Sequence, residues 1–197
     1  MTRHPNLEHR QRNKVRIISG RWRGRWIEFL DSPGLRPTPN RVRETLFNWL
    51  QGYVPGARVL DLFAGSGALG FEAASRGASR CTLIERDARN IDMLQAQANK
   101  LVTDSIDIIQ ADALTWLKQP RHENTYDVVF VDPPFDLGLW QATLASLIQY
   151  QWLALGAQVY VEMPVGVANT LDILTLGIRR QLRAGDVEVW LLTQESL

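Results

Sequence analysis

Hydrophobic and polar residues alternate with two different periods along most of the chain. From residue 57 onward, short apolar runs typical of buried strands are separated by longer segments in which apolar residues recur every three or four positions, as on one face of a helix. This alternation predicts a parallel β-sheet with helices on both faces. The expected strands are residues 58–63, 81–85, 106–110, 128–132 and 158–162, and the expected helices are residues 68–76, 88–101, 113–117 and 139–150.

The C-terminal part of the chain lacks the helical periodicity. Residues 178–183 and 187–192 have the composition of two strands, and the tight turn Ala184-Gly185-Asp186 joins them. Such a hairpin would add one reversed strand to the sheet. The expected fold is therefore α/β and Rossmann-like, a mostly parallel seven-stranded sheet with a terminal antiparallel hairpin.

The first fifty residues form an expected extension in front of the main domain, which we place at residues 51–197. A length of 197 residues suits one compact domain with such an appendage. Within the extension, we expect a disordered arm, an N-terminal β-hairpin with arginines on both limbs and in the turn, a proline-rich loop, and a short amphipathic helix. These segments are residues 1–13, strands 15–19 and 25–29, residues 31–40 and residues 41–50.

Basic residues are concentrated in this extension. The whole chain has a net charge of +1, but residues 1–50 contain eleven Arg or Lys against four Asp or Glu, a charge of +7, which leaves −6 for the rest. Arginines interleaved with tryptophans suit phosphate neutralisation and stacking on bases, so a nucleic acid is the expected partner. A solubilising segment is the alternative. The residues expected to contact the nucleic acid are Arg16, Arg21, Trp22, Arg23, Arg25, Arg41 and Arg43.

Composition and spacing argue against several other classes of protein. The longest apolar runs are far shorter than a membrane span, and the arginine-rich N-terminus lacks the apolar core of a signal peptide. We therefore expect a cytoplasmic protein without membrane contacts, and a monomer. The single cysteine, Cys81, is expected to be a buried, inert thiol. No cluster of His, Cys and Asp has the spacing of metal ligands, so no metal is expected.

A glycine-rich turn follows the first strand of the main domain. Gly65, Gly67 and Gly70 form the pattern G-x-G-x-x-G, which binds dinucleotides in many α/β proteins. Asp61 lies four residues before Gly65, where its carboxylate would repel a pyrophosphate but attract the sulfonium and ammonium groups of S-adenosylmethionine. The motif therefore favours S-adenosylmethionine over a dinucleotide, and a tight turn without a ligand is the third interpretation.

Acidic residues also follow the next two strands. Glu85 is placed to hold both ribose hydroxyls of S-adenosylmethionine or of a nicotinamide cofactor. Asp112 and the backbone N–H of Ala113 are placed to bind an adenine ring, although an N-cap of the following helix explains Asp112 equally well. Because open sheets bind ligands at the carboxyl ends of their strands, these acids support one another. The expected cofactor-binding residues are Asp61, Phe63, Ala64, Gly65, Gly67, Glu85, Arg86, Asp112 and Ala113.

The motif Asp132-Pro133-Pro134-Phe135 follows the fourth strand and is the expected catalytic site. The prolines fix the backbone, so the carboxylate of Asp132 and the carbonyl group of Pro133 can face one ligand. Two such acceptors would grip the N–H bonds of an aromatic amine and help to localise its lone pair towards a methyl donor. Phe135 offers a face on which a base can stack. A rigid turn at the strand end is the alternative.

Two N-terminal segments, together with these motifs, resemble a known family. R-I-I-S-G-R-W-R-G-R at residues 16–25, and especially L-R-P-T-P-N-R-V-R-E-T-L-F-N-W-L at residues 35–50, are similar to the bacterial 16S ribosomal RNA guanine-N2 methyltransferases of the RsmD type. The resemblance covers most of the chain. It implies a class I methyltransferase fold, S-adenosylmethionine as methyl donor, and methylation of the exocyclic N2 amine of a specific guanine in 16S rRNA of the small ribosomal subunit.

The resemblance also implies roles for individual segments. Asp132 and Phe135 would receive a guanine that is flipped out of the RNA. Residues 36–47 are similar to a lid over cofactor and substrate, in which Arg41 and Arg43 would reach a phosphate or the carboxylate of the donor, unless they are only surface charges of the helix. The implied partner is 16S rRNA in the assembling 30S subunit, with ribosomal proteins as further contacts.

Other functions fit parts of the same pattern. Amine methylation of DNA and amide methylation of a protein glutamine use a similar Asp or Asn-Pro-Pro-aromatic motif. The basic extension favours nucleic acid over protein, and the preference for RNA over DNA rests mainly on the resemblance. An NAD-dependent oxidoreductase would need a catalytic His or Tyr-Lys set, but His4, His9 and His122 lie outside every motif. A non-catalytic RNA-binding protein would leave the motif at Asp132 unexplained.

Overall fold

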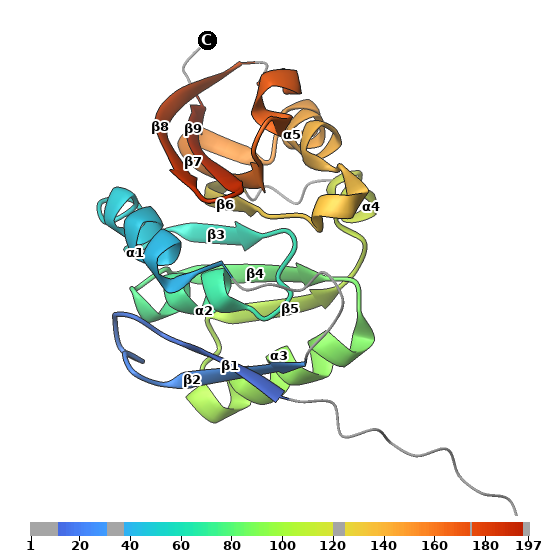
Figure 1. Cartoon of the computed structure of the whole chain (residues 1–197). Helices are drawn as coiled ribbons and strands as arrows, with labels where there is room; N and C mark the ends of the chain where they lie inside the picture. The colour runs from blue at the N-terminus through green and yellow to red at the C-terminus, as the bar shows by residue number, and fades with distance from the viewer. Residues whose placement is uncertain (1–11, 31–37, 120–124, 174, 195–197) are drawn as a thin grey trace, which may run out of the picture.

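The computed structural model describes residues 12–30, 38–119, 125–173 and 175–194. Seven strands form one sheet in the order β5-β4-β3-β6-β7-β9-β8, and β1 and β2 form a separate antiparallel pair (Figure 1). In the large sheet only β9 is reversed, since it runs antiparallel to both β7 and β8. The strands are β1 (Arg12–Arg16), β2 (Trp26–Leu30), β3 (Arg58–Asp61), β4 (Arg80–Glu85), β5 (Ile106–Gln110), β6 (Tyr126–Val131), β7 (Leu153–Pro164), β8 (Leu176–Ala184) and β9 (Val187–Gln194). The expected mostly parallel sheet with one reversed strand is confirmed.

Helices cover both faces of this sheet (Figure 1). The side chains of β6 alternate between these two faces. Val128 and Phe130 pack in a core with α1, α2 and α3, whereas Val129 and Val131 pack in a second core with α4 and α5. A strand that is buried on both faces reads as a continuous apolar run. Within the described residues, none of the helices has the length and apolar character needed to cross a membrane. The helices are α1 (Asn40–Trp49), α2 (Ala68–Ser75), α3 (Ala88–Leu101), α4 (Ala113–Leu117) and α5 (Trp140–Gln149), with short 3-10 helices η1 (Phe135–Leu137) and η2 (Val167–Thr170).

The N-terminal hairpin packs beside α3 and is tied to α2 by one buried carboxylate. Glu72 on α2 accepts hydrogen bonds from the backbone N–H groups of Ile18 and Ser19, at 2.7 and 3.0 Å. It also accepts a bond from Arg76 Nε at 2.7 Å, and Arg43 Nη1 on α1 lies 3.9 Å from its second oxygen. Sequence reasoning did not identify Glu72, because its hairpin partners, the backbone N–H groups of Ile18 and Ser19, lie about fifty residues away in the chain.

Several element bounds differ from the predicted ones for identifiable reasons. β1 ends at Arg16 rather than continuing to residue 19, because Ile17 already begins the turn: its N–H donates to the carbonyl group of Arg25, and its own carbonyl accepts from Gly24. β7 starts at Leu153, five residues before the predicted start, because Leu153 already pairs with Tyr126 of β6. The pairing between β6 and β7 is irregular between Tyr126 and Val128. The elements at residues 88–101, 106–110 and 113–117 have the predicted bounds, and Cys81 is buried as predicted. The predicted arm at residues 1–13 is wrong at its end, since Arg12 and Asn13 pair with β2 as the start of β1, and the predicted loop at residues 31–40 ends one residue too late, since Asn40 begins α1. The rest of the arm and residues 31–37 of the loop lie outside the described residues.

Candidate active site

The glycine-rich turn joins β3 to α2 in a conformation that requires glycine. Gly65 and Gly67 have φ values of +51° and +75°, in the left-handed region that other residues rarely adopt. A Cβ atom on Gly67 would lie 2.6 Å from the side chain of Leu94 on α3. At Gly70, a Cβ atom would lie 2.7 Å from Leu83 on β4, so this glycine lets α2 pack closely against the sheet. The turn therefore exposes backbone rather than side chains to a ligand.

Asp61 ends β3 beneath this turn and is only 3% exposed. Its Oδ2 accepts a hydrogen bond from the N–H group of Gly70 at 3.1 Å. Burial raises the pKa of Asp61 to about 7, and the nearby charge of Glu85 also raises it, whereas hydrogen bonds from Gly70 and Phe63 lower it. A buried carboxylate that is this costly to ionise suits a cationic ligand, which would stabilise its charged form.

Glu85 and Asp112 lie at the ends of the next two strands. Oε2 of Glu85 accepts a hydrogen bond from Gly65 N–H at 2.8 Å, and Oε1 accepts one from Asp87 N–H at 2.7 Å, so Glu85 holds the glycine turn. A carboxylate oxygen has a second lone pair, so each can also accept a ribose hydroxyl. Asp112 is exposed and caps α4: its Oδ1 accepts bonds from the N–H and hydroxyl groups of Thr115, and these lower its pKa. The helix-cap interpretation of Asp112 is thus observed, while its contact with adenine stays a prediction.

Asp132 directly follows β6 and is half-buried. Phe130 on β6 pairs with Asp61 on β3, so Asp132 and Asp61 lie at the same edge of the sheet. Burial raises the pKa of Asp132 well above its usual range, and the charges of Glu162 and Asp61 add to this effect. A hydrogen bond from Thr38 opposes it. Like Asp61, this carboxyl group is poised for a partner that can donate hydrogen bonds.

The rest of the motif carries the chain away from the sheet. Pro133 is buried, and the carbonyl group of Pro134 accepts a hydrogen bond from Leu137 N–H at 3.1 Å, which forms η1. Phe135 is 42% exposed, and its ring centroid lies 5.9 Å from that of Trp140 on α5. An exposed aromatic ring held beside a carboxyl group is suited to stack on a planar base.

The order of the strands brings the predicted cofactor and catalytic residues together. β3 lies between β4 and β6, so Asp61, Glu85 and Asp132 end adjacent parallel strands along one edge. The chain leaves β3 towards the face of α2 but leaves β6 towards the face of α5, and open α/β sheets bind ligands where the chain departs to opposite faces in this way. The residues at this edge can therefore hold a cation and a ribose next to a carboxyl group that accepts N–H bonds.

Known proteins are similar in sequence to most of this chain. A protein-family model described as "Conserved hypothetical protein 95" matches residues 15–193. "Ribosomal RNA small subunit methyltransferase D" of Haemophilus influenzae is 45% identical over 153 residues, which cover 77% of this chain and 79% of the relative. The protein of the same name from Escherichia coli K12 is 42% identical over 188 residues, 95% and 94% of the two chains. The chain belongs to the ribosomal RNA small subunit methyltransferase D family.

A solved structure related to this RsmD-family chain has the same fold. The structure described as "Putative methyltransferase yhhF from Escherichia coli" is 41% identical and superposes with a TM-score of 0.84, covering 94% of this chain and 100% of its own. The Rossmann-like methyltransferase fold expected from the sequence is therefore confirmed.

The predicted RNA contacts of the RsmD-family chain do not gather at the active site. Arg21 lies in the turn of the hairpin, where its Nη2 donates to the hydroxyl groups of Ser105 and Thr103, at 2.8 and 3.2 Å, just before β5 begins. Its backbone N–H donates to Ser75 at the last residue of α2. Because α2 and β5 run between the two edges of the sheet, the hairpin turn lies at the edge opposite Asp61 (Figure 1). The exposed Arg23 shares this turn.

Two of the predicted RNA contacts need correction because their side chains are buried. Trp22 is 6% exposed and is covered by the guanidinium group of Arg21, 4.1 Å from its ring, so it cannot stack on a base. Arg43 is fully buried, and its Nη2 donates to the carbonyl group of Arg16 at 2.9 Å, so it is a structural residue rather than a phosphate contact. The exposed aromatic residue of the hairpin is Trp26, at 54%. The exposed residues Arg16, Arg21, Arg23, Arg25 and Arg41 remain predicted contacts.

Sequence reasoning missed three residues at the active-site edge. Tyr160 and Glu162 lie on β7, and Thr38 precedes α1; all three are buried, and all three interact with Asp132. A signal for Glu162 was present, since it is an acid at the carboxyl end of a predicted strand, the same rule that identified Asp61 and Glu85. Thr38 had no such signal, because only the folded chain brings it next to β7.

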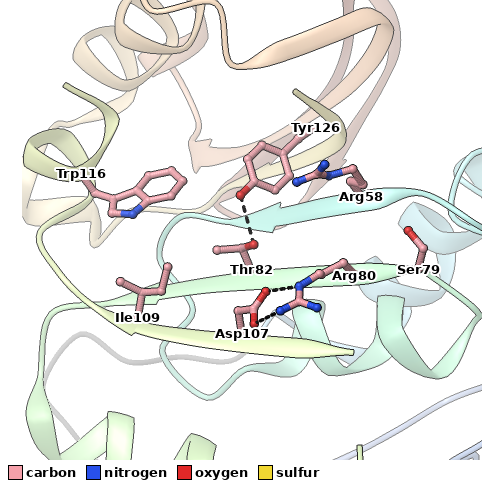
Figure 2. Close-up of a pocket in the computed structure, with 8 residues that line it drawn as sticks. All are labelled: Arg58, Ser79, Arg80, Thr82, Asp107, Ile109, Trp116 and Tyr126. Atoms are coloured by element: carbon pink, nitrogen blue, oxygen red, sulfur yellow. Dashed lines mark hydrogen bonds and ion pairs between the residues drawn. The ribbon is translucent and has the colours of Figure 1, made fainter. Parts of the chain in front are cut away.

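A separate hollow lies near the amino ends of the strands, away from this site (Figure 2). Its polar groups largely bind one another. The hydroxyl group of Tyr126 donates to Thr82 at 3.1 Å, and the guanidinium group of Arg80 forms a two-pronged ion pair with Asp107. Arg58 packs its guanidinium group over the Tyr126 ring at 5.6 Å. These contacts account for the shape of the hollow without a ligand.

Proposed function

We propose that this protein transfers a methyl group from S-adenosylmethionine to the exocyclic N2 amine of a guanine in 16S ribosomal RNA. The observation that carries the proposal is the position of Asp132 beside Asp61 and the glycine turn, at one edge of a methyltransferase fold. Relatives over 40% identical are named as ribosomal RNA small subunit methyltransferases, which supports the class of substrate. The choice of guanine N2 follows the sequence resemblance.

In this proposal the donor lies across the ends of β3, β4 and β5. Asp61 and the glycine turn bind its methionine part, because a buried carboxylate stabilises a cation and the turn offers backbone groups. Glu85 binds the ribose hydroxyls, and Asp112 with the N–H of Ala113 binds the adenine. Phe63, Ala64 and Arg86 line the same edge. Burial raises the pKa of Asp61, so its ionised form needs a nearby positive charge to be stable. This supports a cationic ligand rather than a pyrophosphate, whose negative charge would repel the carboxylate.

The proposed chemistry is a single displacement. Asp132 and the Pro133 carbonyl accept the two N–H bonds of the guanine amine and point its lone pair at the methyl group. The bond from methyl carbon to sulfur breaks as the bond to nitrogen forms, and the sulfonium becomes a neutral thioether. The methylated nitrogen is then positively charged and strongly acidic, so it loses one proton without a dedicated base. Phe135 stacks on the flipped guanine.

RNA binding in this proposal uses both edges of the sheet. Arg23 and Arg25 of the hairpin contact phosphates at some distance from the flipped base, while Arg41 at the start of α1 contacts phosphates near it. We accordingly propose residues 1–50 as an RNA and cofactor contact region and residues 51–197 as the catalytic domain. The protein would act in the cytoplasm as a monomer. Its partner would be 16S rRNA in the assembling 30S subunit, with ribosomal proteins as further contacts.

The proposal is tested by methyl transfer from radiolabelled S-adenosylmethionine to small ribosomal subunits from cells that lack this protein. Nucleoside analysis should find the label in N2-methylguanosine, and Asp132→Ala should remove most turnover while donor affinity stays near that of the wild type. Label in another nucleoside would overturn the base assignment. No label in RNA despite donor binding would favour a DNA or protein amide acceptor.

A further inference from the structure

Strand β8 is the last strand of the large sheet, and it carries three exposed arginines. Arg179, Arg180 and Arg183 lie within its nine residues, which include no acidic residue. Residues 51–197 contain eleven Arg or Lys against seventeen Asp or Glu, a charge of −6, so β8 is a basic strand in an acidic part of the chain. The function proposed above gives these arginines no role.

Other arginines of the main domain are neutralised by acids, but those of β8 are not. Arg76 and Arg80 each form an ion pair with a nearby carboxylate. Within the described part of the chain, no acidic residue forms an ion pair with an arginine of β8. Glu188 on β9 lies across from Arg183, but its Oε1 accepts a hydrogen bond from Trp190 Nε1 at 2.9 Å. The positive charges of β8 are therefore available to an anionic partner.

An irregularity in β8 places two of these arginines on one face of the sheet. The pairing with β9 shifts between Ile178 and Arg180, so Arg179 is an extra residue of β8 at this point, and such a bulge re-aims a side chain. Arg180 lies opposite Leu191, which belongs to the core on the side of α1. The guanidinium group of Arg179 lies 5.4 Å from the ring of Tyr53, which packs against the same core. Both arginines are therefore held on the face that carries α1.

The third arginine lies at the edge of the sheet where the proposed catalytic residues are. β8 runs parallel to β7, because β9 is antiparallel to both, and the two ladders align Arg183 with Met163. Asp132 follows Val131, which pairs with Val161, so it lies one residue short of this level. Three spacings of about 4.8 Å between strands put β8 about 14 Å from β6. An RNA segment that flanks a base flipped towards Asp132 can therefore reach Arg183.

Strand β8 and the N-terminal hairpin flank the catalytic site on opposite sides. β6 is the middle strand of the sheet, β8 is the outer strand at one end, and β5 is the outer strand at the other end (Figure 1). Arg21 in the hairpin turn donates to Ser105 just before β5. The arginines of the hairpin turn thus lie on the side away from β8, and RNA that extends past β7 needs other cations.

We propose that Arg179, Arg180 and Arg183 bind phosphate groups of the RNA substrate on the side of the catalytic site that the hairpin does not reach. The inference rests on the proposed function. Arginine suits this role because its planar guanidinium group binds two phosphate oxygens at once. Charged side chains also protect an exposed strand edge from pairing with another chain, but this protection requires no particular sign of charge. Three unpaired positive charges in an acidic part of the chain complement a polyanion.

The test is the double variant Arg180→Gln with Arg183→Gln, which removes two charges, keeps polar side chains on the edge and leaves Arg179 on Tyr53. The KM for small ribosomal subunits from cells lacking this protein should rise about tenfold at about 0.15 M salt. The slope of log(kcat/KM) against log salt should become shallower by about 1 to 2, while kcat and donor affinity stay unchanged. The corresponding double variant to Lys keeps both charges and should retain most of the affinity.

The matched control removes two exposed positive charges from the other face of the sheet. Arg80 lies beside α4 at the start of β4, and Lys118 follows the last residue of α4. Arg80→Gln with Lys118→Gln changes the net charge by the same amount, so its KM and salt dependence should follow the wild type. An equal rise in KM in this control would mean that only the total charge matters, and would overturn the inference.

A crosslinking experiment gives a readout that does not depend on activity. Gln181 is exposed between Arg180 and Arg183, and the single cysteine of the chain, Cys81, is buried. Gln181→Cys coupled to a thiol-reactive photocrosslinker should therefore crosslink to 16S rRNA when it is irradiated with small subunits. Leu155→Cys, at a position 78% exposed near the start of β7, should crosslink little.

The outcomes separate this inference from the proposed function. An unchanged KM and salt slope in the Gln double variant, without a crosslink at Gln181→Cys, would overturn the inference, and aggregation as the only defect would show that the arginines protect the strand edge. An equal rise in KM in the Lys variant would mean that shape rather than charge is lost, which also overturns it. A wild-type protein that methylates no RNA would instead refute the proposed function.

Discussion

The raised pKa of Asp61 predicts that binding of S-adenosylmethionine depends on pH and releases a proton. Asp61 is 3% exposed, and its pKa is raised to about 7, so the free protein holds a proton there below neutral pH. A cation beside Asp61 requires the ionised form. Binding of the donor below pH 7 must therefore displace this proton, and Asp61→Asn should abolish the effect.

The magnitude follows from the position of this pKa. A carboxyl group with a pKa of about 7 is about nine-tenths protonated at about pH 6 and about nine-tenths ionised at about pH 8. The dissociation constant for the donor should therefore be about tenfold larger at the lower pH, a change of about 1.4 kcal/mol. At about pH 6 the binding step should release about 0.9 of a proton per donor bound.

Isothermal titration calorimetry in buffers of different ionisation enthalpy measures both quantities. Asp61→Asn should bind the donor weakly and with a flat pH dependence, whereas Asp132→Asn should keep the wild-type dependence, because Asp132 does not contact the donor cation in the proposed site. A wild-type affinity that is constant from about pH 6 to pH 8, or an equal pH dependence in Asp61→Asn, would refute the assignment of this carboxyl group to the cation.

Four other perturbations have expected outcomes. Glu72→Ala leaves the fully buried Arg43 without its ion-pair partner and should lower the free energy of unfolding by about 3–5 kcal/mol in urea titrations, and a loss below about 1 kcal/mol would contradict the anchoring role. Gly67→Ala places a Cβ atom 2.6 Å from a side chain at a φ of +75°, so calorimetry should detect little donor binding, and wild-type affinity would show that the turn is not part of the donor site. Replacing both Arg23 and Arg25 by Glu should raise the KM for the RNA and weaken the salt dependence of this KM, while kcat and donor affinity stay unchanged. A loss of kcat alone would instead indicate that these residues act in the methyl-transfer step. In the apo protein, raising the pH from about 4 to about 7 should lower the stability, because the folded state binds the Asp61 proton more tightly than the unfolded chain, and thermal unfolding of wild type against Asp61→Asn checks this.

The sequence was sufficient to predict the elements whose periodicity is strong and local. Residues 88–101 have a clear amphipathic period, and their helix has the predicted bounds. The acids at strand ends were also predictable, because the carboxyl edge of a parallel sheet gathers them whatever the rest of the chain does. Asp61 and Asp132 lie on adjacent strands for this reason.

Burial of individual side chains in the N-terminal segment could not be predicted in the same way. Trp22 and Trp26 are both aromatic residues among arginines, yet one is buried and the other is 54% exposed. The difference arises because Trp22 lies in the turn, where its N–H donates to Ser75 Oγ on α2, while Trp26 begins β2 on the solvent side of the hairpin. Arg43 likewise has a helical position typical of a surface residue, but its guanidinium group is buried, and its Nη2 donates to the carbonyl group of Arg16 at the end of β1.

In the proposed function, the buried contacts of Glu72 would hold two RNA-binding places at a fixed distance. Glu72 on α2 holds the hairpin through Ile18 and Ser19, so the hairpin turn is fixed to the same helix that begins at the glycine turn. A helix is rigid along its axis, so α2 sets the distance between the arginines of the turn and the cofactor edge. A short RNA that reaches only one edge would lose either the phosphate contacts or the base contact. If RNA is bound at both edges as proposed, a large, folded RNA is expected to be a better substrate than a short single strand.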